Sequence, residues 1–114
     1  MIRHINANPA TRHVYVDGEF LDPMRSQKLR NHSPDGFNWG YHGSGPAQLA
    51  LALLLVAVDE IGLNGDSFDW VCRHYQHFKC EVVATWPQGQ LVDVEVDLRE
   101  WLSSRILDGV RKHR

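Results

Sequence analysis

The feature that most constrains the fold is an uncharged, apolar run over residues 46–58, in which Gln48 is the only polar side chain. A helix with apolar residues all round has to be covered on every side in a soluble domain. The run is shorter than the roughly 20 residues that a membrane span requires. We therefore predict a fully buried central helix that begins at Ser44, whose hydroxyl caps free amide groups, and ends at about Ile61, before Gly62.

Length and composition indicate one domain over residues 1–114. The chain has 43% hydrophobic residues, enough for one core, and a formal net charge of −2, which disfavours a protein that coats nucleic acid. The first residues lack the apolar run of a secretory signal, so we expect a cytoplasmic protein. Cys72 and Cys80 are too far apart along one helix for a disulfide, and both are expected to pack in or beside the core.

The predicted strands lie near the two ends of the chain. Residues 13–21 predict a β-hairpin, because β-favouring residues flank Asp17-Gly18, a dipeptide that supplies the positive φ angles of a tight turn. A third short strand is predicted at Gln90–Val92 or slightly beyond, paired with the hairpin. Residues 22–45 show neither a helical nor a strand period, which predicts a long loop that is functional or strongly packed.

Two further helices complete the predicted fold. One is capped near Asp66 or Ser67, presents apolar residues at helical spacing and is halted by Pro87. The last helix begins at about Glu95. The predicted fold class is therefore α+β: a small single domain with an N-terminal hairpin, a third short strand and three helices, of which the central one is fully buried.

The segment 31–48 contains the strongest candidate for a ligand site. Glycines, aromatic residues and small polar groups lead to the N-terminus of the central helix, where free amides and the helix dipole attract anions. Gly43, Ser44 and Gly45 would form such a cradle for phosphate or a nucleotide. The lysine of a phosphate-binding loop and the strand before the glycines are missing. We favour a structural interpretation, in which the glycines let the loop wrap the helix, and keep the anion site as the alternative.

No catalytic group, metal or cofactor is predicted. The residues from which a hydrolytic triad might be assembled are His32, Ser33, Asp35, His42 and Ser44. They are common polar types in one loop, and they do not meet the Gly-x-Ser-x-Gly spacing of a nucleophile elbow. His74, His77 and Glu81 have metal-ligand spacing on a helix, but a site needs further ligands, so a solvated helix face is the favoured interpretation.

Charge is segregated into two blocks that could bind a partner. Residues 23–34 hold basic side chains and no acid, and residues 59–69 hold acidic side chains and no base. Such blocks are usually solvated faces, but exposed charges also steer association with an oppositely charged partner. The predicted partner-binding residues are Arg25, Lys28, Arg30, Asp59, Glu60, Asp66 and Asp69. The basic block leaves open a further interpretation, a nucleic-acid-binding regulator.

A resemblance to known proteins lies at Asn31–Ala52, which reads NHSPDGFNWGYHGSGPAQLALA. This run resembles the signature of a family of small proteins of unknown function from phages, plasmids and integrated elements, and the resemblance covers roughly residues 12–102. It implies no activity, cofactor or catalytic residue. It does imply a mobile-element habitat, where small domains often regulate host machinery by binding it. We therefore expect a non-enzymatic interaction protein that modulates or inhibits a host protein complex, for example a host-defence antagonist such as an anti-CRISPR protein.

Overall fold

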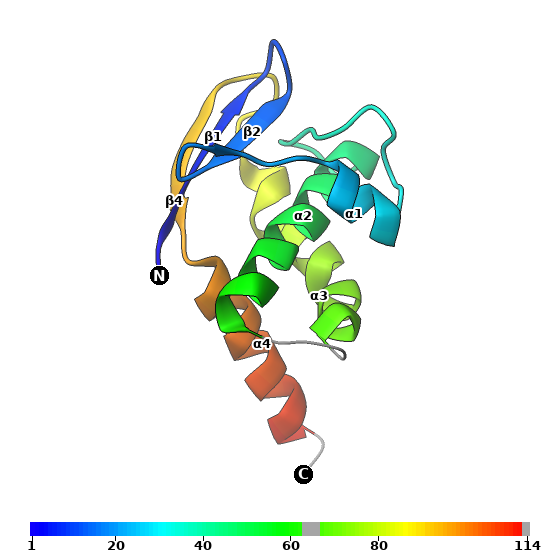
Figure 1. Cartoon of the computed structure of the whole chain (residues 1–114), viewed down its shortest axis with the longest axis vertical. Helices are drawn as coiled ribbons and strands as arrows, with labels where there is room; N and C mark the ends of the chain where they lie inside the picture. Colours follow the sequence, from blue (N-terminus) through cyan, green and yellow to red (C-terminus); the bar gives the residue numbers. More distant parts are fainter. Residues whose placement is uncertain (63–66, 113–114) are drawn as a thin grey trace.

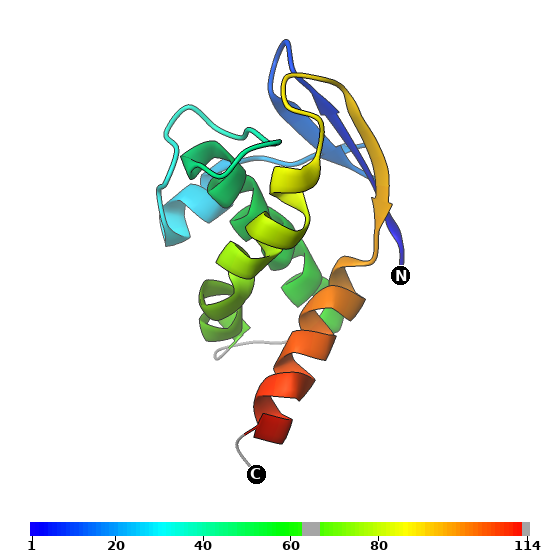
Figure 2. The same cartoon turned by 180° about the vertical axis from the view of Figure 1, so that it is seen from behind.

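The computed structural model describes residues 1–62 and 67–112. It contains a four-stranded antiparallel sheet, and the described helices gather on one side and at one end of it (Figures 1 and 2). The elements in chain order are β1 (Arg3–Asn8), β2 (His13–Val16), β3 (Glu19–Phe20), α1 (Met24–Leu29), α2 (Ser44–Ile61), α3 (Ser67–Glu81), the 3-10 turn η1 (Val83–Thr85), β4 (Val92–Val96) and α4 (Leu98–Lys112). The strand order is β3-β2-β1-β4. The predicted α+β class is confirmed.

The predicted hairpin is formed by β2 and β3. The two strands pair antiparallel, with Tyr15 opposite Phe20. Asp17 and Gly18 turn the chain with φ angles of 51° and 81°, as the tight turn requires. Val14 is fully buried between exposed neighbours, so one face of the hairpin belongs to the core.

The third predicted strand exists, but its predicted partner is wrong. β4 covers Val92–Val96, so it begins where the predicted core of the strand ended and extends beyond it, and it pairs with β1 rather than with the hairpin. The sequence does not predict β1, because Ile5 is the only strong β former in it. Ile5 and Ala7 are buried and alternate with more exposed residues, and the strand is stabilised by pairing on both of its sides.

The final helix starts later than predicted for a related reason. Asp93 and Glu95 recur at every second residue, which is the period of a strand, and they lie in β4. α4 begins at Leu98 instead of Glu95. Asp97 marks the boundary, since its Oδ1 accepts a hydrogen bond of 3.0 Å from the backbone N–H of Glu100 in the first turn.

The central helix α2 begins and ends as predicted. Gly62 terminates it in the left-handed conformation, with φ 76°. Most of its side chains are buried, Leu51 completely. By length and composition alone α2 could cross a membrane, but in this fold it is the helix on which the other elements pack. The capping prediction is wrong: Ser44 already lies in the first turn, the N-cap is Gly43, and no side chain of the described residues caps the helix.

The loop predicted at residues 22–45 contains a short helix, α1. Asp22 starts it, because its Oδ1 accepts a hydrogen bond of 2.9 Å from the backbone N–H of Met24. Six residues are too few to show a helical period, which hides α1 in the sequence. The rest of the segment is irregular and packed: Trp39 is fully buried, and its Nε1–H donates to the carbonyl group of Gln90 at 3.1 Å.

The second predicted helix is shorter than expected. α3 ends at Glu81 and η1 follows, so the chain leaves the α-helix well before Pro87. The carbonyl group of Val83 accepts a hydrogen bond of 3.0 Å from the N–H of Gly40, and this contact binds the loop to the turn. Gly40 is required there, because its φ is 82° and a Cβ atom would lie 2.5 Å from the backbone of Gln88.

Gln48 joins α2 to the irregular segment. Its side chain is fully buried and makes four hydrogen bonds. Oε1 accepts from the backbone N–H groups of His32 at 2.8 Å and Ser33 at 3.0 Å. Nε2 donates to the Ser26 hydroxyl at 2.9 Å and to the carbonyl group of Arg30 at 3.1 Å. One side chain therefore fixes α1 and the residues after it to the central helix.

We expect Gln48→Met to lower the free energy of unfolding by about 3 kcal/mol or more. Methionine has a similar volume but leaves several interior donors and acceptors without partners, each of which costs about 1–3 kcal/mol. Urea unfolding followed by circular dichroism measures the change. The matched control is Leu51→Met, at a buried position of the same helix, which should cost less than about 1.5 kcal/mol. Equal losses in the two variants would contradict this role of the amide.

Candidate functional site

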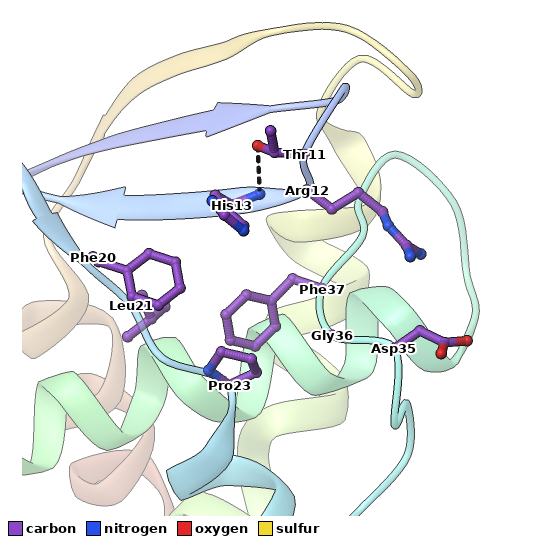
Figure 3. A pocket seen from close by; sticks show the side chains of 9 residues that line it. All are labelled: Thr11, Arg12, His13, Phe20, Leu21, Pro23, Asp35, Gly36 and Phe37. Atoms are coloured by element: carbon purple, nitrogen blue, oxygen red, sulfur yellow. Dashed lines mark hydrogen bonds between the residues drawn. The ribbon is translucent and has the colours of Figure 1, made fainter.

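A pocket of about 140 Å³ opens between the hairpin, the start of α1 and the segment before α2 (Figure 3). Its lining residues are Thr11, Arg12, His13, Phe20, Leu21, Pro23, Asp35, Gly36 and Phe37. They come from separate parts of the chain, which is why sequence reasoning missed the pocket. Two of its aromatic residues lie in parts of the chain that the sequence analysis identified: Phe20 in the predicted hairpin and Phe37 in the segment 31–48.

The inner wall of the pocket is apolar. In Figure 3 the rings of Phe20 and Phe37 face each other across the opening, and Leu21 and Pro23 lie beside them. Phe37 is 2% exposed and belongs to the core, whereas Phe20 is 50% exposed. The His13 ring meets the Phe20 ring edge-on at a centroid distance of 5.1 Å and extends the aromatic wall.

Two charged residues stand at the rim of the pocket. Figure 3 shows Arg12 and Asp35 on the same side, both pointing away from the aromatic rings. Neither forms an ion pair within residues 1–62 and 67–112. The backbone of Arg12 is in the left-handed conformation, with φ 59°. This conformation is stabilised by a hydrogen bond of 2.6 Å from the N–H of Arg12 to the carbonyl group of Asn8. Backbone strain of this kind gathers at functional sites.

The size and lining of the pocket suit one apolar side chain. An apolar cavity of about 150 Å³ holds benzene, so this pocket accommodates a phenyl or isobutyl group. Beside such a group, the Arg12 guanidinium can donate to a carbonyl or carboxylate oxygen, and the Asp35 carboxylate can accept from an N–H.

The two charge blocks predicted as partner surfaces bind other parts of their own chain. Arg25 of α1 forms two hydrogen bonds with Asp59 of α2, at 2.6 and 2.9 Å. Glu60 is turned inward, with 7% of its side chain exposed, and its Oε1 accepts from Arg3 Nε at 2.7 Å. Their use by a partner stays a prediction.

The other members of these blocks are spread over α1 and α3. Lys28 and Arg30 are exposed, as is Asp69 in the first turn of α3. Asp66, predicted both as a helix cap and as a partner-binding residue, lies outside the described residues. Arg30 lies beside α3, where the nearby Cys72 side chain raises the pKa of Arg30 above its usual value. The basic block thus contacts α3 as well as α2.

Packing accounts for the glycines of the predicted anion cradle. A Cβ atom at Gly43 would lie 2.5 Å from Cε2 of Tyr41, and one at Gly45 would lie 2.6 Å from Cβ of Asn38. At Gly45 the crowding is against the Cβ and backbone N of Asn38, so this position has to stay without a side chain, whereas at Gly43 the Tyr41 ring would have to move aside. Ser44 is exposed at this helix end. Binding of an anion there stays a prediction.

The polar residues considered for a hydrolytic triad have separate partners. Nε2 of His32 lies 2.7 Å from the hydroxyl of Tyr75, whereas Nδ1 of His42 lies 3.7 Å from Sγ of Cys80. Cys80 is exposed, so the prediction that both cysteines pack in or beside the core is wrong for this one. Its position, two residues after the buried Phe78, turns it to the opposite side of α3.

His74, His77 and Glu81 do not converge on a common point. Glu81 accepts hydrogen bonds from Arg105 of α4 and is held there. His74 stacks on Trp70, with ring centroids 5.9 Å apart. Within residues 1–62 and 67–112, no three His, Cys, Asp or Glu side chains form a group that could hold a metal ion.

His74 carries an unusual titration property. Both of its ring nitrogens are buried, without a hydrogen-bond partner among the described residues. Burial lowers the pKa of His74 below its usual value, and the positive charges of His77, Arg73 and Arg105 lower it further. The folded protein therefore favours the neutral ring.

We expect acid to destabilise the fold partly through His74. The unfolded chain binds this proton near pH 6.5 (about the ordinary histidine value), whereas the folded chain binds it only at lower pH, so stability falls as the pH drops through this window. His74→Phe keeps a ring against Trp70. When the pH falls from about 7.5 to 5.5, the free energy of unfolding of this variant should decrease by less than that of the native chain. Urea unfolding at each pH measures the two changes.

The matched control is His4→Gln, for which the expected change in pH dependence has the opposite sign. The side-chain hydrogen bond with Asp93 raises the pKa of His4. His4 therefore stabilises the fold below its unfolded pKa, and this contribution is lost as the pH rises through the raised folded pKa. Removing it should enlarge the loss on acidification. If His74→Phe kept the pH dependence of the native chain, the role given to His74 would be wrong.

A family model matches residues 5–104, which include the hairpin, the pocket and β4. The model is described as a family of unknown function, DUF6166. No curated protein and no solved structure gives a significant match to the chain. Because the family match extends over most of the 114 residues, the chain belongs to the DUF6166 family.

Proposed function

We propose that this protein is a non-enzymatic interaction protein of a phage or another mobile element, which binds and modulates a host protein complex. In this proposal the pocket beneath the hairpin receives an apolar side chain of the partner. One observation carries it: the pocket combines a half-exposed aromatic wall, Phe20, with two charges, Arg12 and Asp35, that have no ion-pair partner in the described part of the chain.

The arrangement is typical of an interface hot spot. Interfaces draw most of their binding energy from a few anchors that are seated in pockets and surrounded by a polar rim. An apolar side chain in the pocket would cover the Phe20 ring. A peptide group next to it, on the side where both charges stand, would find a donor in Arg12 and an acceptor in Asp35. A protein segment supplies the apolar group, the carbonyl and the N–H together, which favours a protein as the occupant.

The resemblance of Asn31–Ala52 to a mobile-element family supports a host partner, and Asp35 and Phe37 of this run line the pocket. We place the encounter in the host cytosol, a reducing compartment in which Cys72 and Cys80 stay free thiols. Inhibition of a host-defence complex is the specific form that we propose.

We expect N-acetyl-leucinamide and N-acetyl-phenylalaninamide to bind the pocket with dissociation constants of about a millimolar, because each is a side chain flanked by peptide groups. Amide NMR spectra should show shifts at the lining residues Leu21 and Gly36. Phe20→Ala should weaken binding about fivefold or more, since it removes the half-exposed wall. The matched control, Leu107→Ala, changes an exposed apolar residue of α4 and should leave binding unchanged.

The same variants test the partner itself. A host protein captured by the native chain should be lost with Phe20→Ala and retained with Leu107→Ala. Tighter binding of free leucine than of its amide derivative would indicate a small-molecule site. Probe-induced shifts outside the pocket would show a different binding surface. Either of these two results would contradict the proposal.

A further inference from the structure

β4 is an edge strand with an unoccupied outer side. It is last in the strand order and pairs with β1 alone. In both views of the fold, no described element lies beyond it (Figures 1 and 2). An unpaired edge offers backbone N–H and C=O groups to a further strand.

The hydrogen bonds of the sheet identify which backbone groups are free. The carbonyl group of His4 accepts a bond of 2.8 Å from the N–H of Asp17, so His4 turns its backbone groups toward the hairpin. Successive residues of an antiparallel strand alternate between the two neighbouring strands, so Ile5 turns its groups toward β4. Ile5 lies opposite Val94. Val94 therefore bonds to β1, and its two neighbours in β4 turn their backbone groups outward.

These neighbours, Asp93 and Glu95, are also exposed carboxylates. They alternate with valines that are buried or half-buried, so their side chains lie on the sheet face that points away from the core. Each residue thus presents an N–H, a C=O and a negative charge along the same edge. The raised pKa of His4, caused first by its hydrogen bond with Asp93, is consistent with a negative potential there.

We propose that the edge formed by Asp93, Val94 and Glu95 binds an extended segment of a partner protein that carries lysine or arginine at alternate positions. The partner's backbone pairs with the outward groups of β4. Its cationic side chains lie beside the two carboxylates, since opposite charges on paired strands stabilise the pair. This edge is the opposite side of the sheet from the hairpin that forms the pocket, so the inference is independent of the pocket.

Charge placement argues against a second copy of this chain as the occupant. Antiparallel pairing of two β4 strands about Val94 would set Asp93 opposite Glu95 on both sides of the centre. Like charges directly opposite each other destabilise a strand pair. Next to the edge, a shallow hollow of about 280 Å³ with Tyr15 and Leu91 in its lining leaves room for a further side chain of the partner.

The test uses a peptide of about seven residues in which lysine alternates with valine, and the same peptide with glutamate in place of lysine. The native chain should bind the lysine peptide. The double variant Asp93→Lys, Glu95→Lys should bind it at least about tenfold more weakly and should prefer the glutamate peptide. On binding to the native chain, the amide protons of Asp93 and Glu95 should become protected from hydrogen exchange, which charge attraction alone does not produce.

The matched control is the double variant Glu19→Lys, Glu100→Lys, which makes the same change in net charge at exposed positions away from the edge. It should keep its affinity for the lysine peptide, and so should Phe20→Ala, which separates this test from that of the pocket. A lysine peptide in which the backbone nitrogen of each lysine is methylated keeps its charge but lacks the N–H groups that would donate to β4, and it should bind at least about tenfold more weakly.

Three results would overturn the proposal. The native chain fails to bind the lysine peptide; the N-methylated lysine peptide binds as well as the unmethylated one, so that charge alone accounts for binding; or the native chain sediments as a dimer in which the amides of Asp93 and Glu95 are protected without any peptide. The last result would identify a second copy as the occupant.

Discussion

Gln48 puts a buried side-chain amide in the second turn of an apolar helix, and the segment 26–33 is arranged around its hydrogen bonds. A buried amide without partners costs several kcal/mol, about 2–7 depending on the reference state. Two N–H groups, a hydroxyl and a carbonyl of the segment 26–33 satisfy it. Residues 30–33 belong to no helix or strand, so three of the four bonds also satisfy backbone groups of this segment, the N–H groups of His32 and Ser33 and the carbonyl group of Arg30.

The hydrogen bonds of Gln48 also help to position residues that line the pocket. Once residues 32 and 33 are fixed to α2, the chain turns at once, with the N–H of Gly36 donating to the carbonyl group of Ser33 at 3.2 Å. Gln27 strengthens the corner, because its Nε2 donates to the same carbonyl group at 2.9 Å. Asp35 and Phe37 are thereby placed beneath the hairpin, one at the rim and one in the wall. A polar group in the core thus determines the shape of a surface feature.

The elements that the sequence predicts well are those whose signal is local. The apolar run alone predicts the buried helix α2, and the Asp17-Gly18 dipeptide alone predicts the hairpin turn. β1 and α1 do not: β1 has one strong β former and exists because strands pair on both sides of it, and α1 is six residues long. Asp93 and Glu95 gave a correct signal, the period of two, but a helix start competes with a strand wherever acidic residues precede an apolar stripe.

The partners of charged residues are also hard to predict from the sequence, because they lie far away along the chain. Blocks of like charge in the sequence suggested partner surfaces, yet Arg25 binds Asp59 and Glu60 binds Arg3, over sequence separations that composition cannot reveal. The charges at the pocket rim are isolated in the sequence. A solitary charge gives no pattern to recognise, and only the fold shows that Arg12 and Asp35 stand beside one apolar wall.

The two surfaces that we propose occupy opposite edges of one sheet, and β1 and β2 hold those edges in a fixed relation. Arg3 reinforces this relation, because its guanidinium binds Asp17 at the hairpin turn and Glu60 at the end of α2, both at 2.7 Å. A single pocket or a short strand edge gives weak binding. If both engage one partner, the second contact forms at a high effective concentration, so that two weak contacts add up to a tight and oriented one. The domain is small, with a solvent-accessible surface of 6477 Å². Two separated contacts on a rigid sheet are a physical route by which it can still bind a much larger complex specifically.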